Sequence, residues 1–410
     1  MIGNTLEVFD FIAYGTYAVM IGRTFFPARD PLASLLLSVS TFGVGFVTRP
    51  LGAALIGAYA DRRGARAGML LSLSLMGAGS LLIALLPGWR VLGLAAPLLL
   101  VLARLVQGLA WGGEAGPATI FLRESAPPGR EGRFVAWQGA SQAGAVLLSG
   151  VVGVLIVLAL GRGGLAAGGW RVPFLMGALI VPVGLWLRRG LPDTPVPAAV
   201  AGQASPAASV GRVLACGFVL MAGGTVTQYF LNFTTSYALS VLHIPVASAL
   251  QVSVVVGLAA AGGALATGAL CDRFGARALT LWPRVLLALL VVPLLTLAAA
   301  SRDAGLFLLV AGVIGTLQGS AFVASLVALL AALPAAARNT RFGLLYAVPI
   351  TLFGGTAQIA FVWLIEATGL PTAPGWYVAL ANAAAACAAA GLPRAADGKT
   401  PAVLHPGTAA

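Results

Sequence analysis

The sequence predicts an all-helical integral membrane protein, with twelve transmembrane helices in two pseudo-symmetric six-helix bundles. Three observations lead to this prediction. Of the 410 residues, 59% are hydrophobic and 9% are charged, whereas a soluble domain carries about 25% charged residues. Twelve apolar segments are long enough to cross a bilayer, which takes about 20 residues. The two halves of the chain also repeat each other at one fixed spacing.

Gly, Pro and Arg residues separate the apolar segments. The spans are expected near residues 4–25, 34–60, 67–87, 92–122, 133–160, 170–188, 211–240, 247–271, 277–299, 304–333, 341–367 and 374–393. The Ala/Pro/Ser-rich stretch from Pro192 to Ser209 lacks apolar periodicity and is typical of a linker. The expected organisation is an N-terminal bundle (1–190), a cytoplasmic linker (191–210), a C-terminal bundle (211–394) and a cytoplasmic tail (395–410).

An internal repeat relates the halves. The motif GAYADRRGARAG is followed 211 residues later by GALCDRFGARAL, so that Asp61 corresponds to Asp272. The same displacement carries Gln107 onto Gln318. Parallel six-span repeats are the internal symmetry of a secondary transporter that works by rocking one half against the other.

The net charge of +12 is explained by membrane topology, without a nucleic-acid partner, because the basic residues sit between apolar blocks with no interleaved aromatic residues. With both termini in the cytoplasm, fifteen Arg and Lys residues fall in cytoplasmic loops. Five fall on the opposite side, namely Arg23, Arg29, Arg90, Arg162 and Arg302. This asymmetry predicts the orientation. The Arg- and Ala-rich composition is typical of a GC-rich bacterial genome, so a multi-pass protein of the bacterial inner (plasma) membrane is expected.

No enzyme, metal site or cofactor is predicted. The sequence contains no G-x-x-x-x-G-K-[ST], H-E-x-x-H or G-x-S-x-G motif. Its two histidines, His243 and His405, fall outside the centres of the spans. The three cysteines lie far apart in apolar segments, without metal-ligand spacing.

Across nearly its whole length the chain resembles the major facilitator superfamily, and within it the metabolite:proton symporters. The motifs that carry the resemblance are GNTLEVFDF, GFVTRPLGA, the paired DRxGxR loops, RLVQGLAWGGE, APPGREG and WRVPF. The segments FFPARDPLASLL, GAYAD and WQGASQ are most similar to the citrate and tricarballylate branch. The chain departs from the family at Ala65 and Ala276, where a basic residue is usual.

Two carboxylates, Glu7 and Asp10, lie in the apolar first span and share a helix face with Tyr14. A charge at the centre of a membrane helix costs about 2.5–3.5 kcal/mol, so each acid needs a reason. Glu7 lies near the helix end and could simply reach water. The other interpretation is that the acids form the proton site. Under the 211-residue displacement they map onto Phe218 and Met221, so the C-terminal half lacks these charges and we expect proton coupling in the N-terminal half.

The fourth span supplies a counter-ion for this site. Arg104, Gln107, Trp111 and Glu114 form one helical stripe. An arginine near a carboxyl group favours its ionised form and burial favours its neutral form, so an acid balanced between the two can carry a proton. The resemblance implies acid–Arg coupling between the first and fourth spans. The alternative is a static buried ion pair. The predicted proton-coupling residues are Asp10, Glu7, Arg104 and Glu114.

Arg49, beside the helix-bending Pro50, is the leading candidate for binding a substrate anion, because a guanidinium pairs with a carboxylate through two parallel hydrogen bonds. The alternative is that Arg49 pairs with an acid of a neighbouring span. Neutral groups on stripes of the other spans suit a solute rich in oxygen. Interhelical hydrogen bonding, worth about 0.6 kcal/mol each, would also explain them. These further candidates are Tyr14, Gln107, Gln138, Gln142, Gln228, Tyr229 and Asn232.

The loops DRRGAR and DRFGAR resemble the family's gating motif. The resemblance implies that Asp61 lies at a helix N-terminus, where an anion is favoured, while Arg62 and Arg66 lock the cytoplasmic gate. The alternative is a plain positively charged turn. The gating candidates are Asp61, Arg62, Gly64, Arg66, Asp272, Arg273, Gly275 and Arg277.

The leading functional hypothesis is a proton-coupled symporter that imports a citrate-like carboxylate by alternating access. Its expected partners are a small carboxylate, protons and the lipid bilayer, and it is expected to work as a monomer. Two alternatives remain open. One is a proton symporter of a zwitterion such as proline or betaine. The other is a drug:proton antiporter, a class that tends to carry a Gly-Pro motif in span 5, where this chain reads WQGASQAGAVLLSG.

Overall fold

The computed structural model describes residues 2–63, 65–112, 115–161, 163–179, 182, 207–333 and 338–393, and this part of the chain is helical and contains no strand. The helices of the first half are α1 (Ile2–Thr16), α2 (Ala18–Phe25), α3 (Pro31–Val47), α4 (Arg49–Arg63), α5 (Ala65–Leu85), α6 (Trp89–Leu92), α7 (Ala95–Trp111), α8 (Ala115–Glu124), α9 (Glu131–Leu160), η1 (Gly169–Arg171) and α10 (Val172–Ala178). Those of the second half are α12 (Ala207–Ser240), α13 (Val246–Phe274), α14 (Ala276–Ser301), α15 (Ala304–Ala332), α16 (Arg338–Pro349), η2 (Ile350–Gly354), α17 (Gly355–Thr368) and α18 (Ala373–Gly391).

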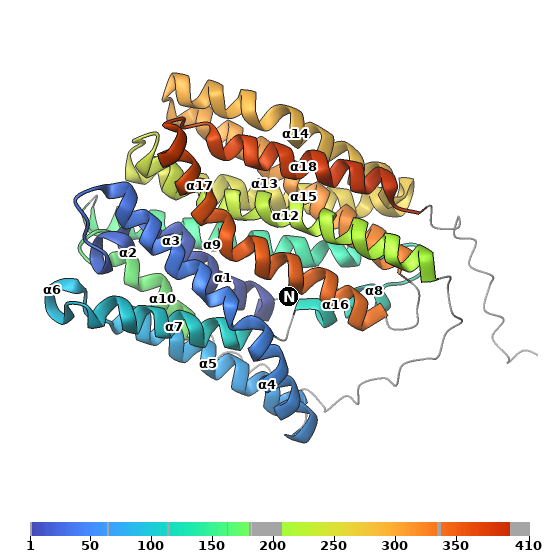
Figure 1. Cartoon of the computed structure of the whole chain (residues 1–410), viewed down its shortest axis with the longest axis horizontal. Coiled ribbons are helices and arrows are strands. Elements are labelled where there is room, and N and C mark those ends of the chain that lie inside the picture. The colour runs from blue at the N-terminus through green and yellow to red at the C-terminus, as the bar shows by residue number, and fades with distance from the viewer. Residues whose placement is uncertain are drawn as a thin grey trace, which may run out of the picture.

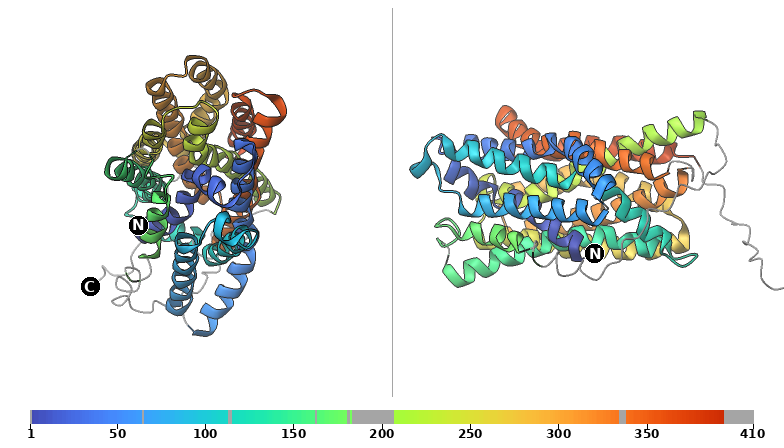
Figure 2. Two further views of the ribbon diagram at one scale, coloured as in Figure 1. Left: turned by 90° about the vertical axis from the view of Figure 1, so that its left-hand side faces the viewer. Right: turned by 90° about the horizontal axis from the view of Figure 1, so that it is seen from below.

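The helices of each half gather into one group, and the two groups lie side by side (Figure 1), as the end-on view also shows (Figure 2). Most helices run along the same axis, with α2 and α6 at one end of the molecule and α4, α8 and α16 at the other (Figure 1). Each of the twelve predicted spans coincides with one or more of these helices, although the sixth is described only at its beginning.

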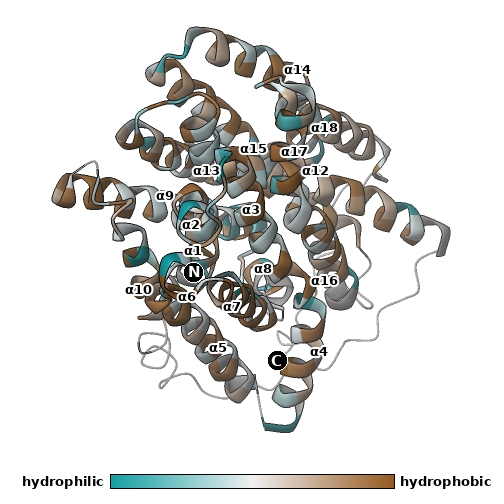
Figure 3. Ribbon diagram, turned by 60° about the vertical axis from the view of Figure 1, so that its left-hand side comes forward, coloured by the Kyte–Doolittle hydropathy of each residue, from teal (hydrophilic) through white to brown (hydrophobic). Residues whose placement is uncertain are grey.

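The outer surface is apolar. Among the described residues, seven helical stretches are long and apolar enough to cross a membrane, and Leu70–Leu85 and Ala95–Trp111 are shorter apolar helices. Hydrophobic residues run along most helices (Figure 3). Leu158 and Leu289 leave 76% and 66% of their surface uncovered. So much exposed apolar surface requires lipid as its surroundings.

Three predicted spans contain an irregularity, one of them at the bend that Pro50 predicts. The first and second spans are each divided into two helices. The second breaks at Thr48 because Pro50 lacks an N–H group, and the Thr48 hydroxyl donates to the Leu105 carbonyl of α7 at 2.8 Å. The eleventh contains the π-helical segment η2 directly after Pro349. Such segments are frequent at functional sites.

Glycines allow the two halves to approach closely. Where α9 meets α13, a Cβ added to Gly268 would lie 2.6 Å from the Gly132 carbonyl oxygen. Where α3 meets α17, a Cβ added to Gly43 would overlap the carbonyl oxygen of Gly355. Small residues at such crossings let membrane helices pack backbone against backbone.

Gly43→Ala should therefore destabilise the protein, because the new methyl group must push α3 away from α17. Overpacking of this kind costs about 1–3 kcal/mol. The matched control is Gly343→Ala in α16, where an added Cβ meets no atom within 4 Å of it. The measurement is the melting temperature in detergent, which should fall for Gly43→Ala alone. Equal melting temperatures for the two variants would show that α3 and α17 do not touch here.

Candidate functional site

Asp10 lies at the centre of the first half and is fully buried. Its Oδ2 accepts hydrogen bonds from the Ser80 hydroxyl of α5 and from Gln107 Nε2 of α7, the latter at 2.7 Å. The helix α10 approaches from another side at Gly177, where a Cβ would collide with the carboxylate. The other oxygen, Oδ1, has no hydrogen-bond partner among the described residues, so this oxygen is free to take a proton.

Arg104 connects to the acid through Gln107. Its Nη1 donates to Gln107 Oε1 at 2.7 Å, while the amide nitrogen of the same glutamine donates to Asp10. Within the described ranges these two charged groups form no direct ion pair. Asp10, Ser80, Arg104 and Gln107 are called the Asp10 cluster below. One carboxamide therefore links the buried acid to the buried cation.

Aromatic rings hold both deep arginines in place. The guanidinium of Arg104 lies 4.2 Å from the ring centroid of Phe11 and 4.6 Å from that of Tyr14. The guanidinium of Arg49 lies 3.5 Å from the ring centroid of Trp111 and 5.0 Å from that of Phe11. Cation–π attraction of this kind strengthens when water is excluded. The two cations therefore flank one shared ring, that of Phe11.

Neither arginine has its hydrogen-bonding capacity filled. Arg104 is fully buried and Arg49 is 9% exposed. Nε and Nη2 of both guanidinium groups lack an acceptor, and neither group forms an ion pair with an acid in the part of the chain that the structure describes. Burying a cation without a partner is costly. The arrangement therefore suits an incoming anion with carboxylate geometry.

Polar side chains of both halves lie near these cations, with Gln138 and Gln142 on α9 of the first half and Tyr229 and Tyr346 in the second. The ring of Tyr229 (α12) packs 5.5 Å from that of Phe46, the other ring that holds Arg49. Gln142 of α9 donates to the Tyr346 hydroxyl of α16 at 2.7 Å, joining the halves. The side-chain amide of Gln138 is fully buried and has no hydrogen-bond partner among the described residues.

Other predicted residues are less central or lie outside the described part. Gln228 donates to Asn232 one turn further along α12, so these two form a local pair. The helix α1 includes Glu7, but its side chain is outside the described residues, and so is the whole of Glu114.

Part of the predicted gate is visible at the end of α13. Asp272 accepts hydrogen bonds from the backbone N–H groups of Gly132 and Arg133 at the start of α9, at 2.6 and 3.1 Å. The Arg133 Nε atom lies 3.8 Å from the same carboxylate. An acid of the second half thus sits at a helix N-terminus of the first half, where a negative charge is favoured.

The remaining gating candidates differ in how far the structure describes them. Gly275 ends α13 with φ +81°, and Arg277 donates to the Ala390 carbonyl of its own half at 3.0 Å. Arg273 lies over the ring of Phe274 at 5.2 Å. In the first repeat the side chain of Arg62 is exposed. The side chains of Asp61 and Arg66, and the whole of Gly64, fall outside the described residues.

Asp272→Asn should loosen the contact between α13 and α9, because it removes the charge that these N–H groups bind. Cys271 provides a natural reporter, since it is buried at this contact, 3.1 Å from where a Cβ of Gly132 would lie. With the other two cysteines replaced by serine, alkylation of Cys271 should become faster. The control is Asp303→Asn, because Asp303 caps its own helix by accepting from Leu306 N at 2.7 Å. Equal alkylation rates in both variants would contradict this account of the gate.

Sequence reasoning missed buried polar groups in both halves. Ser80 belongs to the Asp10 cluster, yet a lone serine in an apolar span carries no distinctive signal. Arg284 of α14 is fully buried in the second half. The positions equivalent to Asp10 and Arg104 are uncharged in this half, but Arg284 lies at a repeat position that this comparison did not cover, and the lone Arg after Pro283 was the available signal.

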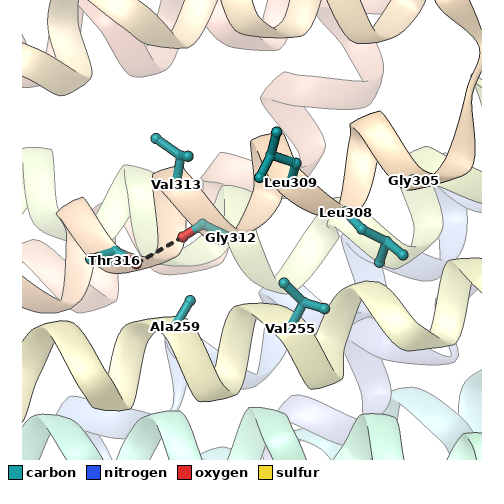
Figure 4. A pocket seen from close by; sticks show the side chains of 8 residues that line it. All are labelled: Val255, Ala259, Gly305, Leu308, Leu309, Gly312, Val313 and Thr316. Atoms are coloured by element: carbon teal, nitrogen blue, oxygen red, sulfur yellow. Dashed lines mark hydrogen bonds between the residues drawn. The ribbon is translucent and has the colours of Figure 1, made fainter.

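A hollow of about 450 Å³ lies away from this site, between α13 and α15. Figure 4 shows Val255 and Ala259 of α13 facing residues of α15 such as Leu308. Its lining contains no charged side chain, and Leu309 is 65% exposed on the outer surface. The hollow is a groove on the lipid-facing side and not a place for a charged solute.

A helical fold in two halves, with an apolar outer surface and charged residues buried in its interior, is typical of a membrane transporter. The Major Facilitator Superfamily model matches residues 6–349. The chain is 36% identical to the citrate-proton symporter of Salmonella typhi over 92% of this chain and 88% of that protein. It is 33% identical to the alpha-ketoglutarate permease of Escherichia coli, with the same two coverages. The chain belongs to the Major Facilitator Superfamily, within the family of metabolite:proton symporters, and is a transporter rather than an enzyme.

The fold agrees with solved structures of the superfamily. A partially occluded, inward-open structure of the xylose transporter XylE from E. coli superimposes with a TM-score of 0.75 over 97% of both chains, at 16% identity. A structure of the D-xylose-proton symporter gives a TM-score of 0.73 over 96% of this chain and 95% of that one, also at 16% identity. At this identity the likeness establishes the fold alone.

Proposed function

We propose that the chain imports a small carboxylate, citrate or a related tricarboxylate, together with protons by alternating access. The observation that carries this proposal is the pair Arg49 and Arg104, two buried cations with unfilled donors and no acid paired with either in the described residues. A zwitterion would bring a positive charge into this pair, whereas a di- or tricarboxylate offers a carboxylate to each cation. The citrate-proton symporters among its relatives support the same choice.

Proton coupling follows from the Asp10 cluster. A substrate carboxylate that binds Arg104 competes with Gln107 Oε1 for the guanidinium N–H groups. Gln107 is then free to turn, and its hold on the Asp10 carboxylate changes. Asp10 takes or releases its proton at Oδ1, the oxygen without a partner. We propose Glu7 and Glu114 as nearby members of the same proton path.

Substrate access follows from contacts between the halves. In the proposed cycle, α9 rocks on α13, and the Asp272 contact and its first-repeat counterpart at Asp61 open and close the cytoplasmic side. The bundles are 1–190 and 211–394, both termini face the cytoplasm of a bacterium, and a monomer suffices. The helix contacts through Gly43 and Gly268 support such rocking, since backbone atoms meet backbone atoms at both crossings.

The test is uptake of labelled citrate into proteoliposomes with an imposed inward proton gradient. Tricarballylate, 2-oxoglutarate, proline and betaine serve as unlabelled competitors, and a protonophore tests coupling. The proposal predicts protonophore-sensitive uptake that tricarballylate blocks. Uptake of proline or betaine without citrate uptake would favour the zwitterion alternative. A proline/betaine transporter of E. coli, 28% identical to this chain, is the reason to include these two competitors.

A further inference from the structure

Arg284 is fully buried, as Arg104 is, and the proposed mechanism does not use it. It lies on α14, inside the second half. Nη1 donates to Asn382 Oδ1 of α18 at 3.0 Å, and Nη2 lies 3.5 Å from both the Leu220 carbonyl of α12 and the Ser325 hydroxyl of α15. Nowhere in the described ranges does an acid pair with it. One permanent charge therefore joins four helices.

These contacts converge on one face of α12. Gly224 leaves room for the guanidinium, since a Cβ there would lie 2.9 Å from Nη2. Asn382, which accepts from Arg284, donates in turn to the Thr227 hydroxyl at 2.7 Å. Gln318 of α15 donates to the Gly224 carbonyl at 2.9 Å. Leu220, Gly224 and Thr227 follow the spacing i, i+4, i+7 and so share a helix face.

The opposite face of α12 carries groups of the candidate site. Tyr229 packs against the ring of Phe46 beside Arg49. Ser236 donates to the Gly15 carbonyl of α1 at 3.1 Å. Because α12 is one continuous helix, fixing one of its faces at positions 220–227 fixes where the other face meets the substrate.

The arrangement mirrors the Asp10 cluster. Gln107 and Gln318 are equivalent in the repeat, and each donates its amide N–H to the first helix of its own half, at Asp10 and at Gly224. The charged members differ in kind, however. A proton can cancel the charge of an aspartate, whereas an arginine in a protein stays charged. The charge of the Asp10 cluster can therefore change, whereas the charge of Arg284 stays fixed.

We propose that Arg284 is a positioning residue that holds the substrate-facing side of α12 in place, the fixed counterpart of the switchable Asp10 cluster. This inference rests on the proposed function for its substrate. It predicts that Arg284 sets substrate affinity and leaves proton coupling untouched. Asn382 connects Arg284 to Thr227 through hydrogen bonds, and Gly224 leaves room for the guanidinium to approach the backbone of α12.

The experiment compares Arg284→Met, Arg284→Lys and the double variant Arg284→Met/Asn382→Leu in proteoliposomes. Replacing both members of a buried polar pair with apolar groups preserves folding better than removing one. The double variant and Arg284→Met should raise the KM for citrate by about tenfold, as expected for a lost hydrogen bond. The maximal rate and the proton:citrate ratio should stay unchanged, and Arg284→Lys should recover part of the affinity.

Thr280→Ala is the matched control, because Thr280 is buried on the same helix and its hydroxyl donates to its own turn, at Ala276 O. Cys216 adds a readout that needs no substrate, since it lies on α12, 3.4 Å from where a Cβ of Gly391 of α18 would lie. With the other cysteines replaced, Arg284→Met should speed its alkylation.

An unchanged KM in the folded double variant would overturn the proposal, and so would a lost proton:citrate ratio, which would place Arg284 in the coupling path. If the wild type does not transport citrate, the proposed function has failed. The same comparison is then made with whichever competitor is accumulated, and the cysteine readout still decides whether Arg284 holds α12.

Discussion

Asp10→Asn should abolish proton-driven accumulation of substrate while leaving exchange of preloaded substrate measurable. Asparagine keeps the side-chain oxygen that accepts from Ser80 and Gln107, so the cluster still assembles. It imitates the protonated acid permanently, and no proton can be released. The measurement is uptake against a concentration gradient, set beside counterflow in the same proteoliposomes.

The control for this variant is Asp30→Asn, an aspartate of the same half that accepts from the N–H groups of Leu32 and Ala33 at the start of α3. It should accumulate substrate as the wild type does. If Asp10→Asn still concentrates substrate in the presence of a proton gradient, Asp10 is not the proton carrier.

Arg49→Lys should weaken substrate binding strongly, even though the charge is kept. A lysine cannot stack on Trp111 as a guanidinium does, and it offers no planar pair of donors to a carboxylate. Losing a charge-assisted hydrogen bond costs about 1.5–3 kcal/mol, so the KM should rise roughly 10- to 150-fold. Arg104→Lys should raise the KM and also lower the proton:substrate ratio, because Arg104 is bonded to Gln107.

Arg171→Lys is the control, because Arg171 also lies over an aromatic ring, that of Trp170 at 4.5 Å, and donates to the Leu86 carbonyl far from the site. Its KM should be unchanged. A normal KM in Arg49→Lys would make Arg49 a structural residue.

The helical fold could be predicted because a membrane-spanning helix is determined by its own apolar length and composition. Contacts with neighbouring helices do not change this in lipid. The spacing of 211 residues located both glutamines, Gln107 and Gln318, which the structure places at equivalent points of the two halves. The family resemblance also implied coupling between an acid of the first span and Arg104 of the fourth, but it could not reveal that Gln107 lies between Asp10 and Arg104. Helical stripes show which residues share a face and not which neighbour that face meets.

The features that the sequence did not predict also depend on which helices are neighbours. Arg284 was overlooked because the search for charges compared repeat positions, and its counterpart in the first half is Leu73. The break at Thr48 was foreshadowed by Pro50, whereas the π-helical segment Ile350–Gly354 depends on packing that a single sequence does not display. The aromatic support of Arg49 comes from three separate helices and follows from no local pattern.

The central claim is that substrate and proton move together through the Asp10 cluster. It is tested most directly by adding citrate outside proteoliposomes that contain a trapped pH dye, with no imposed proton gradient. The account predicts that citrate alone acidifies the interior of wild-type vesicles, and that Asp10→Asn vesicles show no acidification while still exchanging citrate. Citrate entry into wild-type vesicles without any proton movement would contradict it.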